Sequence, residues 1–215
     1  MNNRYSILVW GLIILGIIGI VFGMIAVVTK NSGNAGNALV RPVDSGDWIR
    51  GPKEAKAILV EYSDFQCSAC QYYYYILKKL ENDFPQQLQI AYRYFPLEQI
   101  HKYAKLSAQT AESAGKQGKF WEMHDLLFER QNEWSVSPDA ESNFIIYAQT
   151  LNLDISKFRS DLISEDTEDR IQEDTLSAYE MKLAGTPAFF LNGKQISSPR
   201  DYEEFKGIVQ KEINK

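Results

Sequence analysis

The two cysteines of this chain, Cys67 and Cys70, lie three positions apart, and its 215 residues contain no other cysteine. Residues i and i+3 share one face of a helix, so two thiols at this spacing can close a small disulfide ring with little movement of the backbone. The pair can therefore switch between a dithiol and a disulfide. The fold must bring both sulfurs together within one helical turn.

The residues before the pair predict a buried strand, and those after it predict a helix. Ala57-Ile-Leu-Val-Glu-Tyr62 is a short apolar run rich in strand formers, and Ser63-Asp64 is typical of the turn that ends it. Residues 71–84 carry apolar side chains at helical spacing, and a proline stops the pattern. We therefore expect Cys67 near the start of a helix, where unpaired N–H groups and the helix dipole favour a thiolate. Cys70, one turn deeper, is expected to be the shielded, resolving thiol.

Two other roles for a Cys-x-x-Cys pair fit this chain less well. A zinc site needs further ligands, and His101 and His124, the only histidines, show no partner spacing. A purely structural disulfide is disfavoured because so short a ring removes little conformational entropy from the unfolded chain. We expect a redox-active pair, with no metal ion and no separate cofactor.

A second informative segment lies far downstream. Gly185-Thr-Pro187 is followed by the apolar run Ala188-Phe-Phe-Leu191, the dipeptide Asn192-Gly193 and Lys194-Gln-Ile196. This order predicts two strands joined by a tight type I′ hairpin turn, with a proline at the entry to the first strand, where proline is tolerated. Base rates alone favour a trans bond before Pro187.

Together these segments are similar to the thioredoxin fold, and in detail they resemble the DsbA-type thiol–disulfide oxidoreductases. The resemblance covers roughly residues 47–215. The matching segments are Gly51-Pro-Lys-Glu-Ala55, Glu61-Tyr-Ser-Asp-Phe-Gln-Cys67, Phe95-Pro-Leu97, Gln117-Gly-Lys-Phe-Trp-Glu-Met-His-Asp125 and Gly185-Thr-Pro-Ala-Phe-Phe190. The expected architecture is an α/β thioredoxin-like fold with a helical insertion over about residues 98–184, preceded by a single N-terminal transmembrane helix.

The resemblance implies roles for particular residues. Cys67 would be the attacking cysteine and Cys70 the resolving one. Pro187 would be a cis-proline packed against them, and Thr186 would offer its backbone to an extended substrate. Glu61, six positions before Cys67, would be a buried acid that transfers protons for the buried thiol, since burial raises the pKa of a carboxyl. The alternative for Glu61 is a solvent-facing position on an edge strand.

The residues between the cysteines differ from those of the family's namesake, which has Pro-His where this chain has Ser68-Ala69. That histidine helps to stabilise the thiolate and makes the disulfide strongly oxidising. Ser68-Ala69 supplies no cation, so the direction of electron flow stays open. The protein would introduce or exchange disulfides in secreted or membrane proteins. The alternatives are a disulfide reductase or isomerase, and a non-catalytic thioredoxin-fold chaperone or binding module.

Other side chains near these motifs have less specific predictions. Tyr72-Tyr-Tyr-Tyr75 cannot all face one core, because successive helical residues rotate by about 100°. At least one should be exposed, either as an aromatic contact for unfolded polypeptides or as packing between core and insertion. His124 is expected to be structural, His101 to cap or hydrogen-bond locally, and Asp64 to be a turn or capping residue.

The N-terminal segment predicts where this chemistry takes place. Residues 7–28 form an apolar run without charge that would be about 33 Å long as a helix, enough to cross a bilayer core. The run is longer than the usual core of a signal peptide and lacks a convincing cleavage site, so we expect an uncleaved anchor over residues 1–30. Secretion after cleavage is the alternative. Residues 31–46, which begin small and polar, are expected to form a flexible linker.

The expected partners follow from this placement. Disulfides persist in oxidising compartments, so we expect the catalytic domain on the extracytoplasmic side of the cell membrane. Its substrates would be unfolded or partly folded secreted or membrane polypeptides with cysteines, and the family analogy implies reoxidation by a membrane quinone-linked thiol oxidase. Residues 7–28 would contact the lipid bilayer. A net charge of −5 without a basic run makes nucleic acid an unexpected partner.

If residues 7–28 anchor the protein, the native chain should sediment with membranes and stay there after carbonate extraction, because a spanning helix is held by its apolar contact with lipid. Fractionation followed by mass spectrometry of the N-terminus measures both points. Recovery of a soluble form that starts near Asn31 would show cleavage instead.

Overall fold

The computed structural model describes Trp10 and residues 38–215, so the expected membrane span, apart from Trp10, lies outside the described part of the chain. No helix within these described residues is long and apolar enough to cross a bilayer. The elements in chain order are β1 (Trp48–Arg50), β2 (Ala57–Ser63), α2 (Ser68–Asp83), β3 (Leu88–Tyr94), α3 (Ala104–Gly115), α4 (Phe120–Glu129), α5 (Gln131–Trp134), α6 (Ala140–Thr150), α7 (Ile155–Leu162), α8 (Glu165–Glu180), β4 (Ala188–Leu191), β5 (Lys194–Ile196) and α9 (Tyr202–Ile213).

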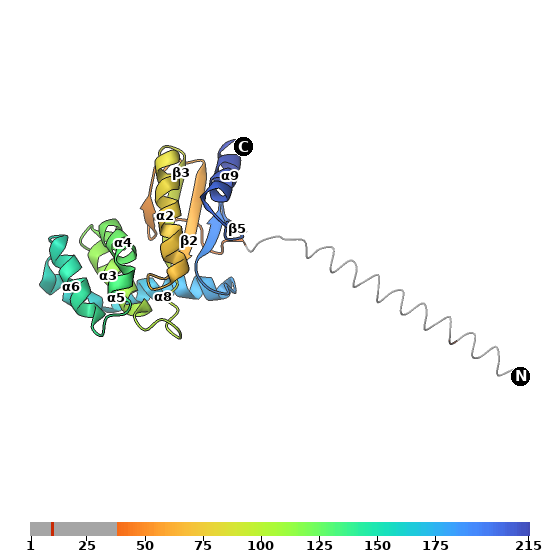
Figure 1. Ribbon diagram of the computed structural model, residues 1–215. Helices are drawn as coiled ribbons and strands as arrows, with labels where there is room; N and C mark the ends of the chain where they lie inside the picture. The colour runs from red at the N-terminus through yellow and green to blue at the C-terminus, as the bar shows by residue number, and fades with distance from the viewer. Residues whose placement is uncertain (1–9, 11–37) are drawn as a thin grey trace, which may run out of the picture. The chain divides into compact units, whose positions relative to one another are not determined.

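The strands form one mixed sheet in the order β1-β3-β2-β4-β5 (Figure 1). β2 pairs in parallel with β3 and antiparallel with β4, while β1 and β5 run antiparallel to their neighbours at the two edges. The predicted strand before the cysteines is therefore the centre of the sheet. The α/β architecture that we expected is confirmed.

The structure also confirms the predicted hairpin and refines the first helix. Asn192 and Gly193 have φ values of 47° and 78°, the left-handed backbone that a type I′ turn requires at both positions. Helix α2 begins at Ser68, three residues earlier than its apolar pattern indicated, because Cys67 itself is the N-cap. Strands β1 and β3 had no counterpart in the sequence analysis.

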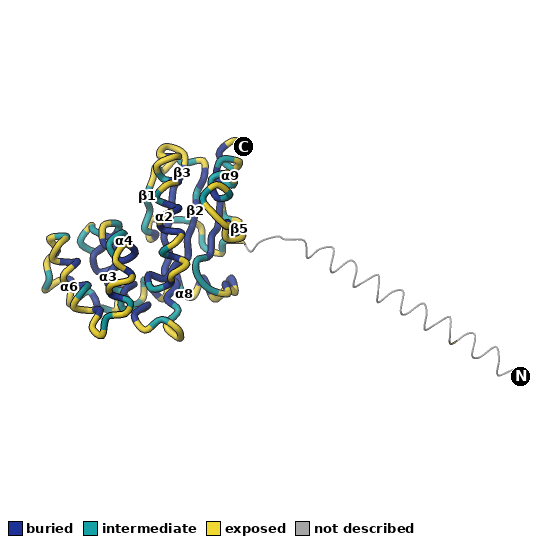
Figure 2. Tube along the Cα trace, viewed as in Figure 1, coloured by how far each residue is buried: buried dark blue, intermediate teal, exposed yellow. Residues whose placement is uncertain are grey.

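Each face of the sheet is covered by helices, and the three inner strands β2, β3 and β4 are almost wholly buried (Figure 2). Helices α2 and α9 contribute Leu77, Leu80 and Phe205 to a cluster that packs against Leu59 and Phe189 of the sheet. The opposite face carries a second cluster that joins Val60 and Phe190 to Ala178 of α8. The alternating side chains of β2 thus point into two different cores.

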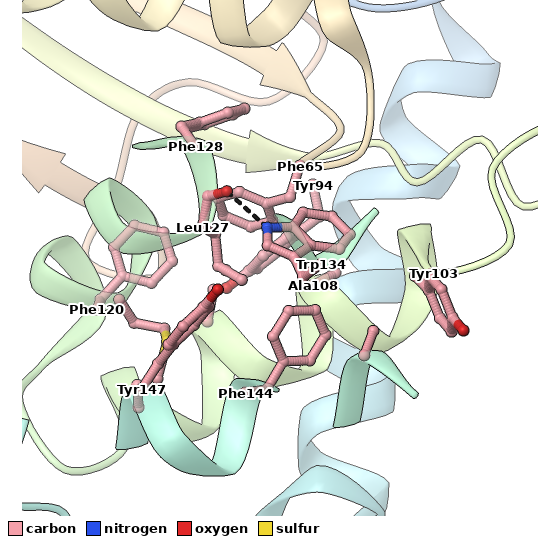
Figure 3. Close-up of a cluster of buried hydrophobic side chains, with 14 of the residues drawn as sticks. Phe65, Tyr94, Tyr103, Ala108, Phe120, Leu127, Phe128, Trp134, Phe144 and Tyr147 are labelled. Carbon is pink, nitrogen blue, oxygen red and sulfur yellow. Dashed lines mark hydrogen bonds between the residues drawn. The ribbon is translucent and has the colours of Figure 1, made fainter. Parts of the chain in front are cut away.

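The helices between β3 and β4 form the expected insertion, and their core continues into the end of the sheet that holds the cysteines. One cluster contains Phe65, Cys67 and Cys70 together with Phe120, Leu127, Phe128, Trp134 and Phe144 of the insertion. Figure 3 shows these rings converging, with the Trp134 indole N–H donating to the carbonyl of Leu127 at 2.8 Å. The helical insertion therefore belongs to the same apolar cluster as the two cysteines.

A buried ion pair ties the segment before β1 to the sheet. The Arg93 guanidinium on β3 is fully buried and donates to both carboxylate oxygens of Asp47, at 2.8 and 2.9 Å. The same side chain donates to the carbonyls of Arg41 and Pro42. Residues 38–46, which we assigned to the linker, thus contact the domain, whereas residues 31–37 lie outside the described part of the chain.

A tight contact at Gly115 generates a stability prediction. A Cβ there would lie 2.3 Å from the Trp48 ring, which stacks on Phe120 at 4.4 Å and donates to Glu112 at 2.8 Å, so the ring cannot easily move. Gly115→Ala should lower the free energy of unfolding by about 1–3 kcal/mol. Gly207→Ala, at an exposed position of α9 with no contact within 4 Å, should raise it by up to about 1 kcal/mol. Urea unfolding measures both, and a similar change in the two variants would contradict the steric argument.

Candidate active site

Cys67 occupies the N-cap of α2, with φ −73° and ψ 122°, and its two neighbours in the first turn present free backbone N–H groups to it. An N-cap is usually a residue whose side-chain oxygen accepts these hydrogen bonds. Here a thiol stands at that position and makes no side-chain capping hydrogen bond, and the N–H groups of Ala69 and Cys70 lower its pKa. Both cysteines are free thiols in this structure. Cys67 keeps 8% of its surface exposed, whereas Cys70 is fully buried. Only Cys67 is open to a partner.

The two thiols titrate in opposite directions. The pKa of Cys67 is lowered to about 5 because the Cys70 thiol donates a hydrogen bond to it, and the backbone N–H groups of Cys70 and Ala69 and the Thr186 side chain add to this effect against the opposing effect of burial. Burial raises the pKa of Cys70 well above its usual value, and the negative charges of Cys67 and Glu61 raise it further. At neutral pH the site therefore combines a thiolate at the rim with a protonated thiol below it.

The loop that contains Thr186 and Pro187 lies beside the cysteines, as the resemblance implied. The bond between these two residues is cis, contrary to the base-rate expectation. The Cys67 thiol lies 3.5 Å from the Thr186 carbonyl oxygen. An open hollow borders this loop and is lined by residues 184–188 and 195–198.

Glu61 lies on the central strand and is 3% exposed, so the solvent-facing alternative on an edge strand does not hold. Burial raises its pKa to about 7; a hydrogen bond from Ser63 lowers it, and the charge of Cys67 raises it. Such a carboxyl can accept or release a proton near neutral pH. The negative charge of Glu61 raises the pKa of Cys70, which places the two groups in electrostatic contact.

Asp64 has a larger structural role than the turn that we predicted. Its carboxylate accepts hydrogen bonds from the backbone N–H of Gln66 at 2.7 Å and of Leu97 at 2.9 Å, and it pairs with the His101 imidazole at 2.7 Å. The first contact is the expected turn. The other two hold the loop after β3 against the strand-to-helix junction, so His101 acts on the site through Asp64.

Gln131 is a further site residue that the sequence analysis missed. Its buried side-chain amide donates to the carbonyls of Phe65 at 2.7 Å and Cys67 at 3.0 Å. Gln131 is the first residue of α5, so the helical insertion directly holds the backbone on both sides of the active-site turn. No local motif marks this residue, because its partners lie more than sixty positions away.

His124 and the four tyrosines behave largely as expected. His124 is buried among aromatic rings and pairs with Asp125 at 2.9 Å, and burial lowers its pKa, which fits a structural role. Tyr72 and Tyr75 are each 49% exposed, while the two tyrosines between them are buried. Among the described residues no group of three potential metal ligands comes together.

Comparison with known proteins agrees with this geometry. Residues 44–211 match the family described as thioredoxin. The chain belongs to the thioredoxin family. Two similar solved structures are oxidised BdbD from Bacillus subtilis (TM-score 0.73, 23% identity, 85% of this chain and 100% of that chain) and the thiol-disulfide exchange protein α-DsbA2 from Wolbachia pipientis (TM-score 0.67, 16% identity, 78% and 88%). They confirm the thioredoxin-like fold with its helical insertion. The CxxC pair of this chain, Cys67 and Cys70, lies within the matched residues 44–211.

The matching curated proteins are longer than this chain. The Na⁺/H⁺ antiporter NhaA 3 of Salinispora tropica is 37% identical over 172 residues, and NhaA 1 of Salinispora arenicola is 40% identical over 172 residues. Each match covers 80% of this chain and 26% of the antiporter. The thioredoxin-family chain thus spans about a quarter of the length of these relatives.

The raised pKa of Glu61 predicts a pH-dependent stability. The folded protein holds a proton on Glu61 that the unfolded chain releases above the ordinary pKa of 4.5, so this group costs stability as the pH rises from about 4.5 to about 7. Glutamine does not titrate. The stability of reduced Glu61→Gln relative to the wild type should therefore rise by about 2–3 kcal/mol between pH 5 and pH 8. Urea unfolding at both pH values measures it, and a pH-independent difference would contradict the raised pKa.

Proposed function

We propose that this protein is an extracytoplasmic thiol–disulfide oxidoreductase that introduces or exchanges disulfides in secreted and membrane proteins through Cys67 and Cys70. The observation that carries the proposal is the asymmetry of the two thiols. Cys67 is accessible and stable as a thiolate, so it can form and break a bond to a substrate sulfur. Cys70 is buried and protonated, so it does not compete for the substrate.

The reaction follows from that asymmetry. A substrate thiolate attacks the Cys67–Cys70 disulfide at the accessible sulfur of Cys67, and Cys70 leaves as a thiolate that takes up a proton. A second substrate thiol then attacks the substrate sulfur of the mixed disulfide, and Cys67 leaves. The substrate gains a disulfide and the enzyme is left as the dithiol. In this scheme Glu61 is the proton donor for Cys70, and the backbone next to Pro187 and Thr186 aligns the substrate.

The lowered pKa of Cys67 favours the oxidising direction. A disulfide is a stronger oxidant when its reduced form is stabilised, and stabilisation of the thiolate does this. The value of about 5 lies between the values of about 3.5 and about 7 that strongly oxidising and reducing members of this class reach. We infer an intermediate potential, so the reductase or isomerase direction is the second candidate.

The location and partners extend this proposal. Residues 7–28 would hold the domain at the outer face of the cell membrane, with residues 31–37 as the start of a tether. A membrane quinone-linked thiol oxidase would restore the disulfide. Tyr72 and Tyr75, each half exposed on α2, offer apolar contact to an unfolded substrate.

Trapping of the mixed disulfide tests the function. Cys70→Ser removes the thiol that releases a stalled substrate, so it should accumulate dithiothreitol-sensitive, high-mass adducts through Cys67, identifiable by mass spectrometry. Cys67→Ser is the matched control and should give none, because Cys70 is buried and protonated. Adducts through Cys70, or no adducts together with a wild type that neither oxidises nor reduces thiols, would favour the non-catalytic binding module.

A further inference from the structure

Ser63 lies on the same face of β2 as Glu61, because alternate residues of a strand share one side. Its hydroxyl donates a hydrogen bond to Glu61 Oε1 at 2.9 Å. Both side chains are buried, with exposures of 1% and 3%. Within residues 38–215, this hydroxyl is the one hydrogen-bond donor recorded for the Glu61 carboxyl. Ser63 therefore occupies Oε1 of Glu61, and the second carboxyl oxygen has no such hydrogen bond from this part of the chain.

Among the described residues, no group that faces Glu61 from a neighbouring element donates a second hydrogen bond to its carboxyl. Cys67 and Cys70 lie on the α2 side and interact with Glu61 by charge. Tyr92, its register partner on β3, has a buried hydroxyl without a hydrogen-bond partner among the described residues. Of these groups, Cys67 opposes ionisation of the carboxyl, because its negative charge raises the pKa of Glu61.

Arg50 and Lys78 line a cavity that Glu61 also lines, but among the described residues neither forms an ion pair with its carboxyl. A narrow cavity with room for about one water molecule is lined by Glu61 and also by Arg50, Lys78, Glu81 and His124. Arg50 and Lys78 bind Asp125 at 3.0 and 2.9 Å. Their charges are thus already paired, which leaves Ser63 as the direct stabiliser of ionised Glu61.

We propose that Ser63 is the positioning residue for proton exchange between Glu61 and Cys70: its hydroxyl holds Oε1 and stabilises the carboxylate, so that the other oxygen carries the proton. This inference rests on the proposed function. No role in the reaction follows for Ser63 from the sequence, which predicts only a turn residue, whereas the structure places it at the end of β2.

The step balances without any further reactant. When a substrate thiolate attacks Cys67, the Cys67–Cys70 bond breaks and its electron pair goes to the sulfur of Cys70, which takes the proton from Glu61. The carboxylate that remains keeps the hydrogen bond from Ser63. In the reverse step Cys70 gives its proton to this carboxylate as its sulfur bonds to Cys67, and the substrate leaves as a thiolate. Without the hydroxyl, burial would keep Glu61 protonated at neutral pH and remove the acceptor.

The test compares Ser63→Ala, Ser63→Thr and Ser177→Ala in the full-length, reduced protein. Ser177 is the matched control because its buried hydroxyl bonds Tyr62 at 2.7 Å, on the other face of the sheet from Glu61. The titration of Glu61 is followed by infrared spectroscopy of its carboxyl band, which is assigned with Glu61→Gln. The rate at which Cys70 resolves a Cys67–glutathione mixed disulfide is measured across the same pH range.

Ser63→Ala should shift the titration of Glu61 upward by about one pH unit and slow the Cys70 step about fivefold at pH 7, with recovery at higher pH. Ser63→Thr keeps the hydroxyl and should behave as the wild type, and Ser177→Ala should change neither quantity. An unshifted titration in Ser63→Ala, an equal shift in Ser177→Ala, or no rescue by threonine would overturn the inference. A wild type that exchanges no disulfide would overturn the proposed function instead, and the inference with it.

Discussion

The whole site depends on a sulfur atom in the place where a helix normally has a capping oxygen. Helix α2 begins one residue after Cys67, so the sulfur lies at the helix start, where the N–H groups of Ala69 and Cys70 lower its pKa. Unpaired N–H groups at a helix start are satisfied best by an anion, and the thiolate is that anion. The pKa of Cys67 is thus lowered first by the hydrogen bond from the Cys70 thiol, and the N–H groups of the helix start lower it further.

That geometry is held from three directions. The central strand β2 delivers the turn, Asp64 binds it to the loop after β3, and Gln131 of the insertion binds the carbonyls on both sides. Each clamp satisfies a backbone or buried polar group that would otherwise cost free energy in the apolar cluster around the cysteines. The insertion therefore does more than cover the site, because its Gln131 side chain holds the backbone of Cys67 in position.

The parts of this arrangement that the sequence predicted are those encoded within a few residues. The strand before Cys67 and the hairpin at Asn192 follow from alternation and turn chemistry, and the family resemblance added Pro187 and Glu61. The clamps could not be predicted, because Asp64 meets His101 across 37 positions. Strand β3 was not predicted for another reason: Gln89 and Arg93 interrupt its apolar pattern. Only the folded protein shows that Gln89 donates to the carbonyl of Pro52 and that Arg93 pairs with Asp47.

The same geometry limits what Ser68-Ala69 can do to the redox potential. The N–H groups that stabilise the thiolate belong to the peptide backbone, so they remain whatever side chains stand between the cysteines. A histidine at either position would add a cation to this baseline rather than create the stabilisation. Ser68-Ala69 adds no such cation and leaves the thiolate stabilisation at the level that the helix start and Cys70 provide, while the charge of Glu61 on β2 helps to raise the pKa of Cys70. Thiolate stability and proton supply are coupled, because the Cys70 thiol donates the hydrogen bond that lowers the pKa of Cys67, and the charge of Cys67 raises the pKa of Cys70.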